Sequence, residues 1–407
     1  MTLRHGREYL AIPGPTNVPD AVLNAMHRPA VEIYTGPLLE ITSSCLEDLK
    51  RLFATTTGRS YIYAANGHGA WEAALTNTLS RGDKVLVLGS GRFATLWGDM
   101  AAFVGIEVEE LSFGFRNAVD PAAVEARLKA DRAGEIKAVL MVQVDTASSV
   151  MNDVAAVGRA IQAAGHGALF MVDAIASLAT MPFEMDAWGV DVAVTGSQKG
   201  LMCPPGLGFN AAGPRARAAH QRAGLRTAYW DWTKRDGAQH YEKYCGTPPE
   251  HLLFGLRQAI DLLFEEGLEA VFERHRLLAE ATRRAVAVWG EGGALDLNIV
   301  APSARSNSVT SVRTEGIDPQ VLRDYCSEVC GVMLGEGIGE LSGKGLRIAH
   351  MGHVSGAMML GTLGSIETAL GALDIPHSKG GVQAAVDFLA GAVSAAPAEA
   401  GLRNAGA

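Results

Sequence analysis

The chain has 407 residues, a length that allows one large domain and a smaller second one, each with its own core. Apolar residues make up 48% of it and charged residues 19%, which is typical of a folded α/β protein rather than a disordered one. The formal net charge of −9, without any cluster of Lys and Arg, argues against nucleic acid as a partner and favours small-molecule ligands.

The first fifteen residues contain no apolar segment of a signal peptide, and no charge-free run along the chain is long enough to span a bilayer. We therefore expect a cytoplasmic protein with no membrane contact. The five cysteines are scattered and lack Cys-x-x-Cys spacing, so the sequence predicts neither a disulfide framework nor a metal site.

Short β-rich runs alternate with helical patterns between residues 60 and 212. Such unbroken apolar runs are typical of a parallel sheet that is covered on both faces. Between them, segments such as 69–79, 94–105 and 153–165 carry apolar residues at three- and four-residue spacing, as crossover helices do. The pattern predicts a doubly wound α/β domain. Its predicted strands are 61–66, 84–89, 108–113, 137–145, 168–175 and 190–197.

The hydrophobic pattern changes after the stretch GTPPE (246–250), because residues 250–289 form one nearly continuous helical pattern. This pattern is long enough to lead from the first domain into a second, and we place the boundary near residue 267. The segments 306–314, 318–329 and 344–350 then suggest a small α+β domain. We predict an N-terminal arm (1–20), a large domain (21–266), a small C-terminal domain (267–378), and a C-terminal helix with a frayed tail (379–407).

Polar residues stand at the carboxyl ends of five predicted strands, which is the edge where open parallel sheets bind ligands. Taken alone, Lys199 is more simply explained as a solvated loop lysine. The convergence of five strand ends on one crevice is what favours a function for it. The residues at these ends are Asn66 to Gly69, Gly91 to Phe93, Asp145 with Thr146, Asp173, and Ser197 to Lys199.

The stretch NGHG (66–69) directly precedes a predicted helix and has the properties of a phosphate site. Its small residues let free backbone N–H groups and the positive end of the helix reach an anion. No Gly-x-Gly-x-x-Gly with an acidic partner follows a strand, so a dinucleotide fold is not supported. A phosphate site, Lys199 and the carboxylate of Asp173 together suggest pyridoxal phosphate as the cofactor.

Seven motifs follow one another along the chain: PGPTNVP (13–19), GAWEAALTNTLSRGDKVLV (69–87), QVDTASSV (143–150), VDAIASL (172–178), SQKGLMCPPGLGF (197–209), YWDW (229–232) and LRIAHMG (346–352). In these motifs and their order the chain resembles the class V, fold-type I pyridoxal-phosphate aminotransferases, in the branch that uses glyoxylate. The resemblance covers nearly the whole chain. It implies a large domain that binds pyridoxal phosphate around a mostly parallel seven-stranded sheet, followed by a small α+β C-terminal domain.

The resemblance also implies how the cofactor ring is held. Lys199 would bind the cofactor covalently and then act as the base and acid of the proton shift, for which its pKa must be lowered. Asp173 would pair with the pyridine nitrogen, so that the ring can take up electrons. Thr146 would donate to the ring hydroxyl, and Phe93 would stack on the ring face.

The same resemblance implies a cup for the cofactor phosphate that is shared between two subunits. Gly67, His68 and Gln198 would hold the phosphate from one chain. Tyr244 and Thr247 would complete the cup from the partner subunit, so the active sites of a homodimer would be shared. Whether such dimers pair further stays open.

Two features of the sequence bear on the substrates. Arg347 in LRIAHMG matches the arginine that clamps the substrate α-carboxylate in the family, a role suited to a bidentate planar group. Arg92 stands where many relatives have histidine, and residues 33–37 (IYTGP) replace the DHRGP stretch of many serine–glyoxylate enzymes. In both respects the chain is similar to the L-aspartate–glyoxylate aminotransferases of the β-hydroxyaspartate pathway.

From the resemblance we expect a ping-pong transfer of an amino group from a small L-amino acid to glyoxylate, which gives glycine. L-Aspartate is the favoured donor and L-serine the next, with Arg92 as the partner of a second carboxylate. Serine or alanine as donor, with glyoxylate or pyruvate as acceptor, remains the alternative.

Three other functions remain to be weighed against this one. A cysteine desulfurase would need a nucleophilic cysteine near Cys326 or Cys330, but those lyases usually have histidines where this chain has Gln198 and Phe93. A binding protein without catalysis is disfavoured by the presence of the lysine, aspartate and arginine together. Pyridoxamine–pyruvate transamination is the third possibility, and its lysine motif lacks the glutamine seen at Gln198.

Overall fold

In the computed structural model of the chain, which describes residues 2–394, the largest element is a seven-stranded sheet in the order β2-β10-β9-β8-β5-β3-β4. The strands from β9 to β4 pair parallel with one another, and only β10 runs antiparallel to its two neighbours. The predicted mostly parallel α/β sheet is therefore confirmed. Its strands are β2 (Arg59–Ala64), β3 (Lys84–Gly89), β4 (Glu107–Ser112), β5 (Ile136–Val142), β8 (Leu169–Asp173), β9 (Val192–Gly196) and β10 (Leu207–Ala212).

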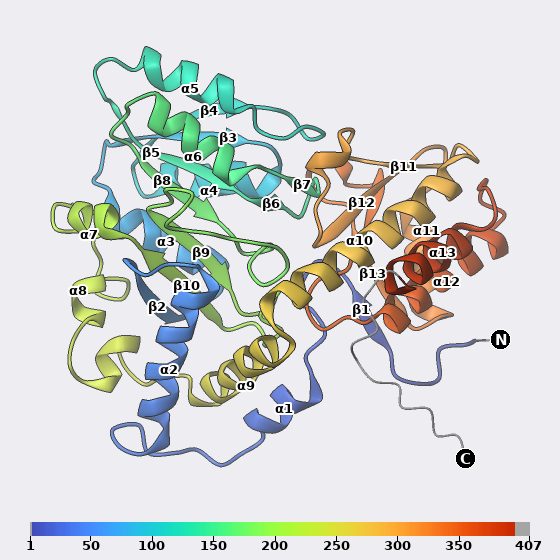
Figure 1. The fold of residues 1–407 in the computed structure, drawn as a ribbon, viewed down its shortest axis with the longest axis horizontal. Coiled ribbons are helices and arrows are strands. Elements are labelled where there is room, and N and C mark those ends of the chain that lie inside the picture. The colour runs from blue at the N-terminus through green and yellow to red at the C-terminus, as the bar shows by residue number, and fades with distance from the viewer. Residues whose placement is uncertain (1, 395–407) are drawn as a thin grey trace.

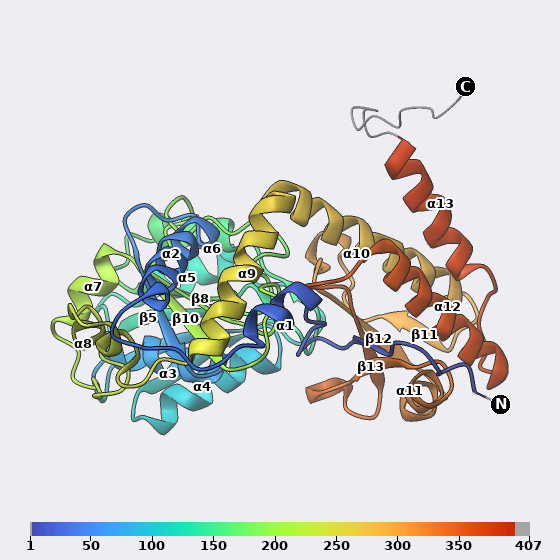
Figure 2. The ribbon, with the colours of Figure 1, turned by 90° about the horizontal axis from the view of Figure 1, so that it is seen from below.

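Helices cover both faces of this sheet, as Figure 2 shows with α3 and α4 on one side and α2, α6 and α9 on the other. Alternate residues of a strand enter the two cores: Val139 and Met141 pack with α2, α6 and α9, whereas Leu140 and Val142 pack with α3 and α4. This explains the unbroken apolar runs. The helices of this part are α1 (Asp20–Met26), α2 (Pro37–Leu52), α3 (Gly67–Thr78), α4 (Arg92–Phe103), α5 (Pro121–Ala130), α6 (Val154–Ala163), α7 (Pro214–His220), α8 (Trp232–Arg235), η1 (His240–Tyr244) and α9 (Glu250–Glu266).

One predicted strand, 137–145, is wrong at its end. Strand β5 stops at Val142, and the chain then forms a separate hairpin of β6 (Val144–Asp145) and β7 (Val150–Met151). The side chain of Asp145 accepts a hydrogen bond from the backbone of Ala147, a local bond that favours a turn over a continued strand. Asp145 and Thr146 therefore lie beyond the sheet edge.

A second sheet of five strands, in the order β1-β13-β14-β12-β11, lies beside the large one (Figure 1). Its first strand comes from the N-terminal arm, and Gly267 separates α9 from the long helix α10 that continues along this sheet. The predicted division at residue 267 stays a prediction. The remaining elements are β1 (Tyr9–Ala11), α10 (Leu268–Gly290), β11 (Leu295–Leu297), η2 (Pro302–Ala304), β12 (Val309–Thr314), α11 (Pro319–Glu328), β13 (Val332–Glu336), η3 (Gly339–Leu341), β14 (Gly345–Ala349), α12 (Gly356–Ala372) and α13 (Gly381–Ser394).

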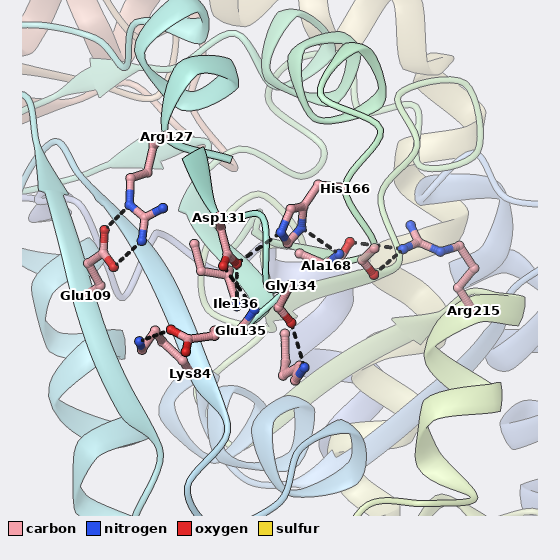
Figure 3. A network of polar contacts seen from close by, with 12 residues as sticks. Lys84, Glu109, Arg127, Asp131, Gly134, Glu135, Ile136, His166, Ala168 and Arg215 are labelled. Atoms are coloured by element: carbon pink, nitrogen blue, oxygen red, sulfur yellow. Dashed lines mark hydrogen bonds and ion pairs between the residues drawn. The ribbon is translucent and has the colours of Figure 1, made fainter. Parts of the chain in front are cut away.

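Figure 3 shows ion pairs and hydrogen bonds around the starts of β3, β5 and β8, at the edge of the large sheet opposite the predicted crevice. Lys84 pairs with Glu135 at 2.9 Å, and His166 meets Asp131 at 3.1 Å. These side chains satisfy one another and fix the strand starts. The predicted frayed tail, 395–407, lies outside the described residues, and no helix within 2–394 is long and apolar enough to cross a membrane.

Candidate active site

Lys199 lies in the turn after β9 and reaches back toward the N-terminal arm, where its ammonium group donates to the carbonyl oxygen of Pro13. Gly14 has a φ of +113°, and a Cβ atom on it would collide with the nitrogen of Lys199. Glycine is therefore the residue that fits at this position of the N-terminal arm. Burial, and then the charge of Arg347, lower the pKa of Lys199 to about 8, while Asp173 acts in the opposite direction. A lysine with this pKa supplies neutral amine near neutral pH.

Asp173 ends β8 and is 3% exposed. One carboxylate oxygen accepts the indole N–H of Trp71 at 2.9 Å, and the other accepts the backbone N–H of Ile175 at 2.6 Å. Burial raises the pKa of Asp173 to about 7, against the effect of these hydrogen bonds and of Lys199. A carboxylate in this state gains from a cationic partner such as a protonated pyridine nitrogen.

Trp71 is a site residue that the sequence analysis missed, because it fits equally well as a core residue of α3. The available signal was its position one turn after Gly67. Helical side chains lean toward the N-terminus of their helix, so a residue one turn inside a helix that begins at a strand end points back to that end.

The start of α3 and the side chain of Gln198 face the same place. A Cβ atom on Gly196 would lie 3.1 Å from the amide oxygen of Gln198 and 3.6 Å from the backbone nitrogen of Gly67. That amide oxygen is buried and has no hydrogen-bond partner among residues 2–394. Asn66 caps this helix by accepting the backbone N–H of Gly69, so the N–H groups of Gly67 and His68 are the ones left at the helix start for an anionic group such as a phosphate. The amide of Gln198 would bind such a group through its N–H and not through its oxygen.

His68, the second residue of α3, lies with its ring 4.5 Å from that of Trp71, measured between centroids. Partial burial and the nearby charge of Lys199 lower its pKa. His68 therefore lies near Trp71 and within reach of the charge of Lys199, and its contact with the cofactor phosphate stays a prediction.

Phe93 and Thr146 contact other residues of the predicted site, Trp71 and Arg347 respectively. The ring of Phe93, in the first turn of α4, packs edge-on to Trp71 at 6.4 Å between centroids. Thr146 is 4% exposed, and its hydroxyl makes no hydrogen bond within the part of the chain that the structure describes. The hydroxyl of Thr146 thus has no partner within the described residues that a ligand would have to displace.

Arg347, on β14 of the second sheet, reaches Thr146, which directly follows β6. Its Nη1 donates to the carbonyl oxygen of Thr146 at 3.1 Å, and its Nε donates to that of Glu336 at 2.6 Å. Burial lowers the pKa of the guanidinium to about 10, so it stays a cation at neutral pH, and the charge of Asp145 supports that state. A partly buried cation without a direct carboxylate partner among residues 2–394 is suited to receive one from a substrate.

Arg92 is not part of the group of residues around Lys199, Asp173 and Arg347. Its side chain is exposed and lines a cavity of about 280 Å³ together with three acidic residues, Asp99, Glu110 and Glu340. No hydrogen bond or ion pair joins it to another residue of the 2–394 segment. Its proposed contact with a substrate stays a prediction.

Tyr244 and Thr247 also lie away from Lys199 in the same chain. The side chain of Tyr244 is 2% exposed, and its hydroxyl lies 2.9 Å from that of Thr42 in α2. Thr247 is exposed, three residues beyond it. Their contribution to the site of a partner subunit stays a prediction.

The comparisons with known proteins agree with this arrangement. Residues 8–347 match the family described as aminotransferase class-V. The chain is 40% identical to a serine–glyoxylate aminotransferase of Methylorubrum extorquens over 95% of its length and 97% of that protein. It is 38% identical to an L-aspartate–glyoxylate aminotransferase of Paracoccus denitrificans, over 96% and 98% of the two chains.

Among solved structures, the ureidoglycine–glyoxylate aminotransferase of Bacillus subtilis is similar, with a TM-score of 0.86 at 27% identity. The similarity covers 95% of this chain and 98% of that one. A partly buried lysine of lowered pKa, a buried carboxylate and backbone N–H groups at a helix start are the groups that pyridoxal phosphate requires. The chain therefore belongs to the class-V aminotransferases and is a fold-type I transaminase that depends on pyridoxal phosphate.

Proposed function

We propose that this enzyme moves the amino group of a small L-amino acid to glyoxylate and so produces glycine, in a ping-pong reaction with L-aspartate and L-serine as donors. The observation that carries the proposal is a partly buried lysine of lowered pKa whose ionisation is affected by the carboxylate of Asp173 and by the guanidinium of Arg347. The relatives named for serine–glyoxylate and L-aspartate–glyoxylate transfer, each about as long as this chain, support glyoxylate as the acceptor.

The residues of the chain would each have a separate role in this reaction. Bound pyridoxal phosphate supplies a conjugated ring that takes up electrons from the substrate. Asp173 would hold a proton at the ring nitrogen, since the N–H groups of Trp71 and Ile175 fix both of its oxygens. Phe93 would keep the ring plane in place, and Thr146 would donate to the ring hydroxyl.

Lys199 would then move the proton of the reaction. With a pKa of about 8 it can accept a proton at the substrate α-carbon and return it one position away, without a large cost in either direction. Arg347 would hold the α-carboxylate and thereby fix which bond to the α-carbon faces the lysine. Closure of the crevice between the two domains would exclude water.

A panel of donors and acceptors on purified enzyme tests this function. We expect 15N to pass from labelled L-aspartate and L-serine to glyoxylate, with labelled glycine detected by mass spectrometry. Transfer to pyruvate should be slower. If pyruvate is the better acceptor for every donor, or if pyridoxamine is the only amine used, the glyoxylate assignment is wrong.

Arg92 provides the prediction on donor choice. A dicarboxylic donor brings a second negative charge, which would be costly to leave unpaired, and Arg92 is an arginine without a partner in residues 2–394. We expect Arg92→Ala to lower kcat/KM for L-aspartate by roughly 10- to 100-fold, the value of a charged hydrogen bond. Steady-state assays with each donor measure this.

L-Serine and L-alanine are the internal controls, since neither carries a second carboxylate. Their kcat/KM should change less than about threefold in Arg92→Ala, because only a contact made in the transition state lowers it. Equal losses of kcat/KM for all three donors would show that Arg92 acts on the cofactor or on the fold. L-Serine would then replace L-aspartate as the preferred donor in the proposal.

The shared phosphate cup gives a prediction on assembly. Tyr34 and Tyr241 are exposed and meet edge-on at 6.2 Å between ring centroids. The exposed Tyr229 follows Ala228, whose carbonyl oxygen accepts from the thiol of Cys245 at 3.4 Å. Exposed aromatic residues of this kind are typical of subunit interfaces. We expect a homodimer in which Thr247→Ala retains the cofactor more weakly, roughly 5- to 20-fold for one lost hydrogen bond to a charged group.

Light scattering gives the mass, and dialysis followed by absorbance gives the retention of the cofactor. Ser44→Ala, an exposed hydroxyl on α2, is the matched control and should retain the cofactor normally. A monomer with full activity at the assay concentration would contradict the shared cup.

A further inference from the structure

Helix α4 begins without a cap of its own, because the residue before it is Gly91, which has no side chain. The cap comes from the β6 hairpin. One carboxylate oxygen of Asp145 accepts the backbone N–H of Phe93 at 2.7 Å and that of Ala94 at 3.2 Å. A side chain 52 residues away therefore fixes where α4 begins and how its first turn is oriented.

The close approach of this carboxylate explains the glycine. A Cβ atom on Gly91 would lie 2.3 Å from the carboxyl carbon of Asp145. The backbone of Gly91 is extended, with a φ of 169°, a conformation that any residue adopts. The glycine is thus required by the neighbouring carboxylate and not by the backbone.

Asp145 is also linked to Arg347, the residue proposed to bind the substrate carboxylate. Its side chain is 0% exposed, and its second oxygen accepts the backbone N–H of Ala147 at 3.0 Å. The residue between them is Thr146, whose carbonyl oxygen accepts a hydrogen bond from Arg347. The negative charge of Asp145 supports the cationic state of that guanidinium.

We propose that Asp145 is a positioning residue that orients Phe93 and Arg347 together, and so couples the surface that stacks on the cofactor ring to the clamp on the substrate carboxylate. The proposal rests on the roles given above to Phe93 and Arg347. The single buried carboxylate of Asp145 can orient both residues. One of its oxygens accepts the backbone N–H groups of Phe93 and Ala94 at the start of α4. Its negative charge supports the cationic guanidinium of Arg347, which also donates to the carbonyl oxygen of the next residue, Thr146.

Asp145→Asn in the holoenzyme tests this. Asparagine has almost the same shape and keeps one acceptor oxygen, but it removes the charge and turns the other oxygen into a donor. We expect the apparent Kd for L-serine, from the change in cofactor absorbance, to rise roughly 5- to 50-fold, the range of coupling between residues in one network. The circular dichroism band of the bound cofactor should change as well, since it reports the orientation of the ring.

A double-mutant cycle identifies the route of the effect. If Asp145 acts through Arg347, then Asp145→Asn should weaken L-serine binding less than about twofold when Arg347 is already alanine. A weakening as large as that in the wild-type background would overturn the proposed coupling.

Asp191→Asn is the matched control. Asp191 is another buried aspartate whose carboxylate accepts a backbone N–H, that of Phe170 at 2.8 Å, but it precedes β9 at the opposite edge of the sheet from Lys199. Its variant should melt at a lower temperature with unchanged L-serine binding and unchanged dichroism. If Asp145→Asn behaves in the same way, Asp145 is a structural residue only and the proposal is wrong.

Gly91→Ala gives a second approach to the same contact, because its methyl group must displace the Asp145 carboxyl while the charge remains. We expect the dichroism band to change here too, and an unchanged band would count against the proposal even if Asp145→Asn does not fold. The wild-type enzyme separates this proposal from the function itself. If it shows no spectral response to L-serine, L-aspartate or glyoxylate, the proposed function fails, whereas a normal wild-type response with unaffected variants overturns only the role of Asp145.

Discussion

Lys199→Ala is expected to abolish the visible absorbance of the bound cofactor and to lower kcat by about 10⁴-fold, the upper range for loss of a general acid and base. Lys199 supplies a partly buried amine with a pKa of about 8 at the predicted cofactor site. Alanine would also leave the pair of Asp173 and Arg347 without the residue between them. Absorbance spectra and single-turnover rates measure both effects.

Lys137→Ala is the matched control for this prediction. Lys137 lies near the start of β5, at the opposite edge of the sheet, where its ammonium group donates to the carbonyl oxygen of Gly134 at 2.7 Å. Its loss should leave both the spectrum and the rate unchanged. A Lys199→Ala enzyme with a normal spectrum would show that the cofactor is bound elsewhere.

Arg347→Ala should lower kcat/KM by roughly 30- to 1000-fold for every amino acid, because a buried charged contact to the α-carboxylate is worth about 2 to 4 kcal/mol. The guanidinium is a cation that two backbone carbonyls hold in place, so it is oriented before the substrate arrives. Binding of the cofactor should survive, since no cofactor contact is assigned to this residue. Steady-state assays and cofactor titration separate the two effects.

The matched control is Arg313→Ala on β12, the strand next to β14 in the same sheet. Arg313 is partly exposed, and that substitution should leave kcat/KM within about threefold of the wild-type value, because no substrate contact is assigned to it. Near-normal turnover in Arg347→Ala with all amino acids would place the carboxylate clamp at a different residue.

The large sheet and most of the crevice could be predicted from the sequence, because both follow from local patterns. Apolar runs alternating with helical segments give a parallel sheet, and the carboxyl ends of its strands share one edge. Asp173 and Lys199 were found in this way, at the ends of β8 and β9. Arg347 comes from the second sheet and was assigned only through the motif that it shares with the family.

The contacts that orient these residues could not be predicted, since they join segments far apart in the chain. The carbonyl oxygen of Pro13 that receives Lys199 lies 186 residues away from it, and no local pattern encodes that distance. Trp71 could not be recognised as a site residue, because the sequence pattern of a tryptophan on a helix is the same whether its ring only packs in a core or its N–H also donates a hydrogen bond. The direction of Arg92 depends on how the first turn of α4 is capped, which is itself a long-range contact.

The central claim, that the crevice around Lys199 holds the cofactor, is tested most directly by reduction with borohydride followed by peptide mapping. Borohydride fixes the cofactor to whichever lysine carries it. We predict that mass spectrometry finds the pyridoxyl group on the peptide that contains SQKGLMCPPGLGF, at Lys199. A pyridoxyl group on any other lysine, or none on a protein with the cofactor bound, would contradict the account.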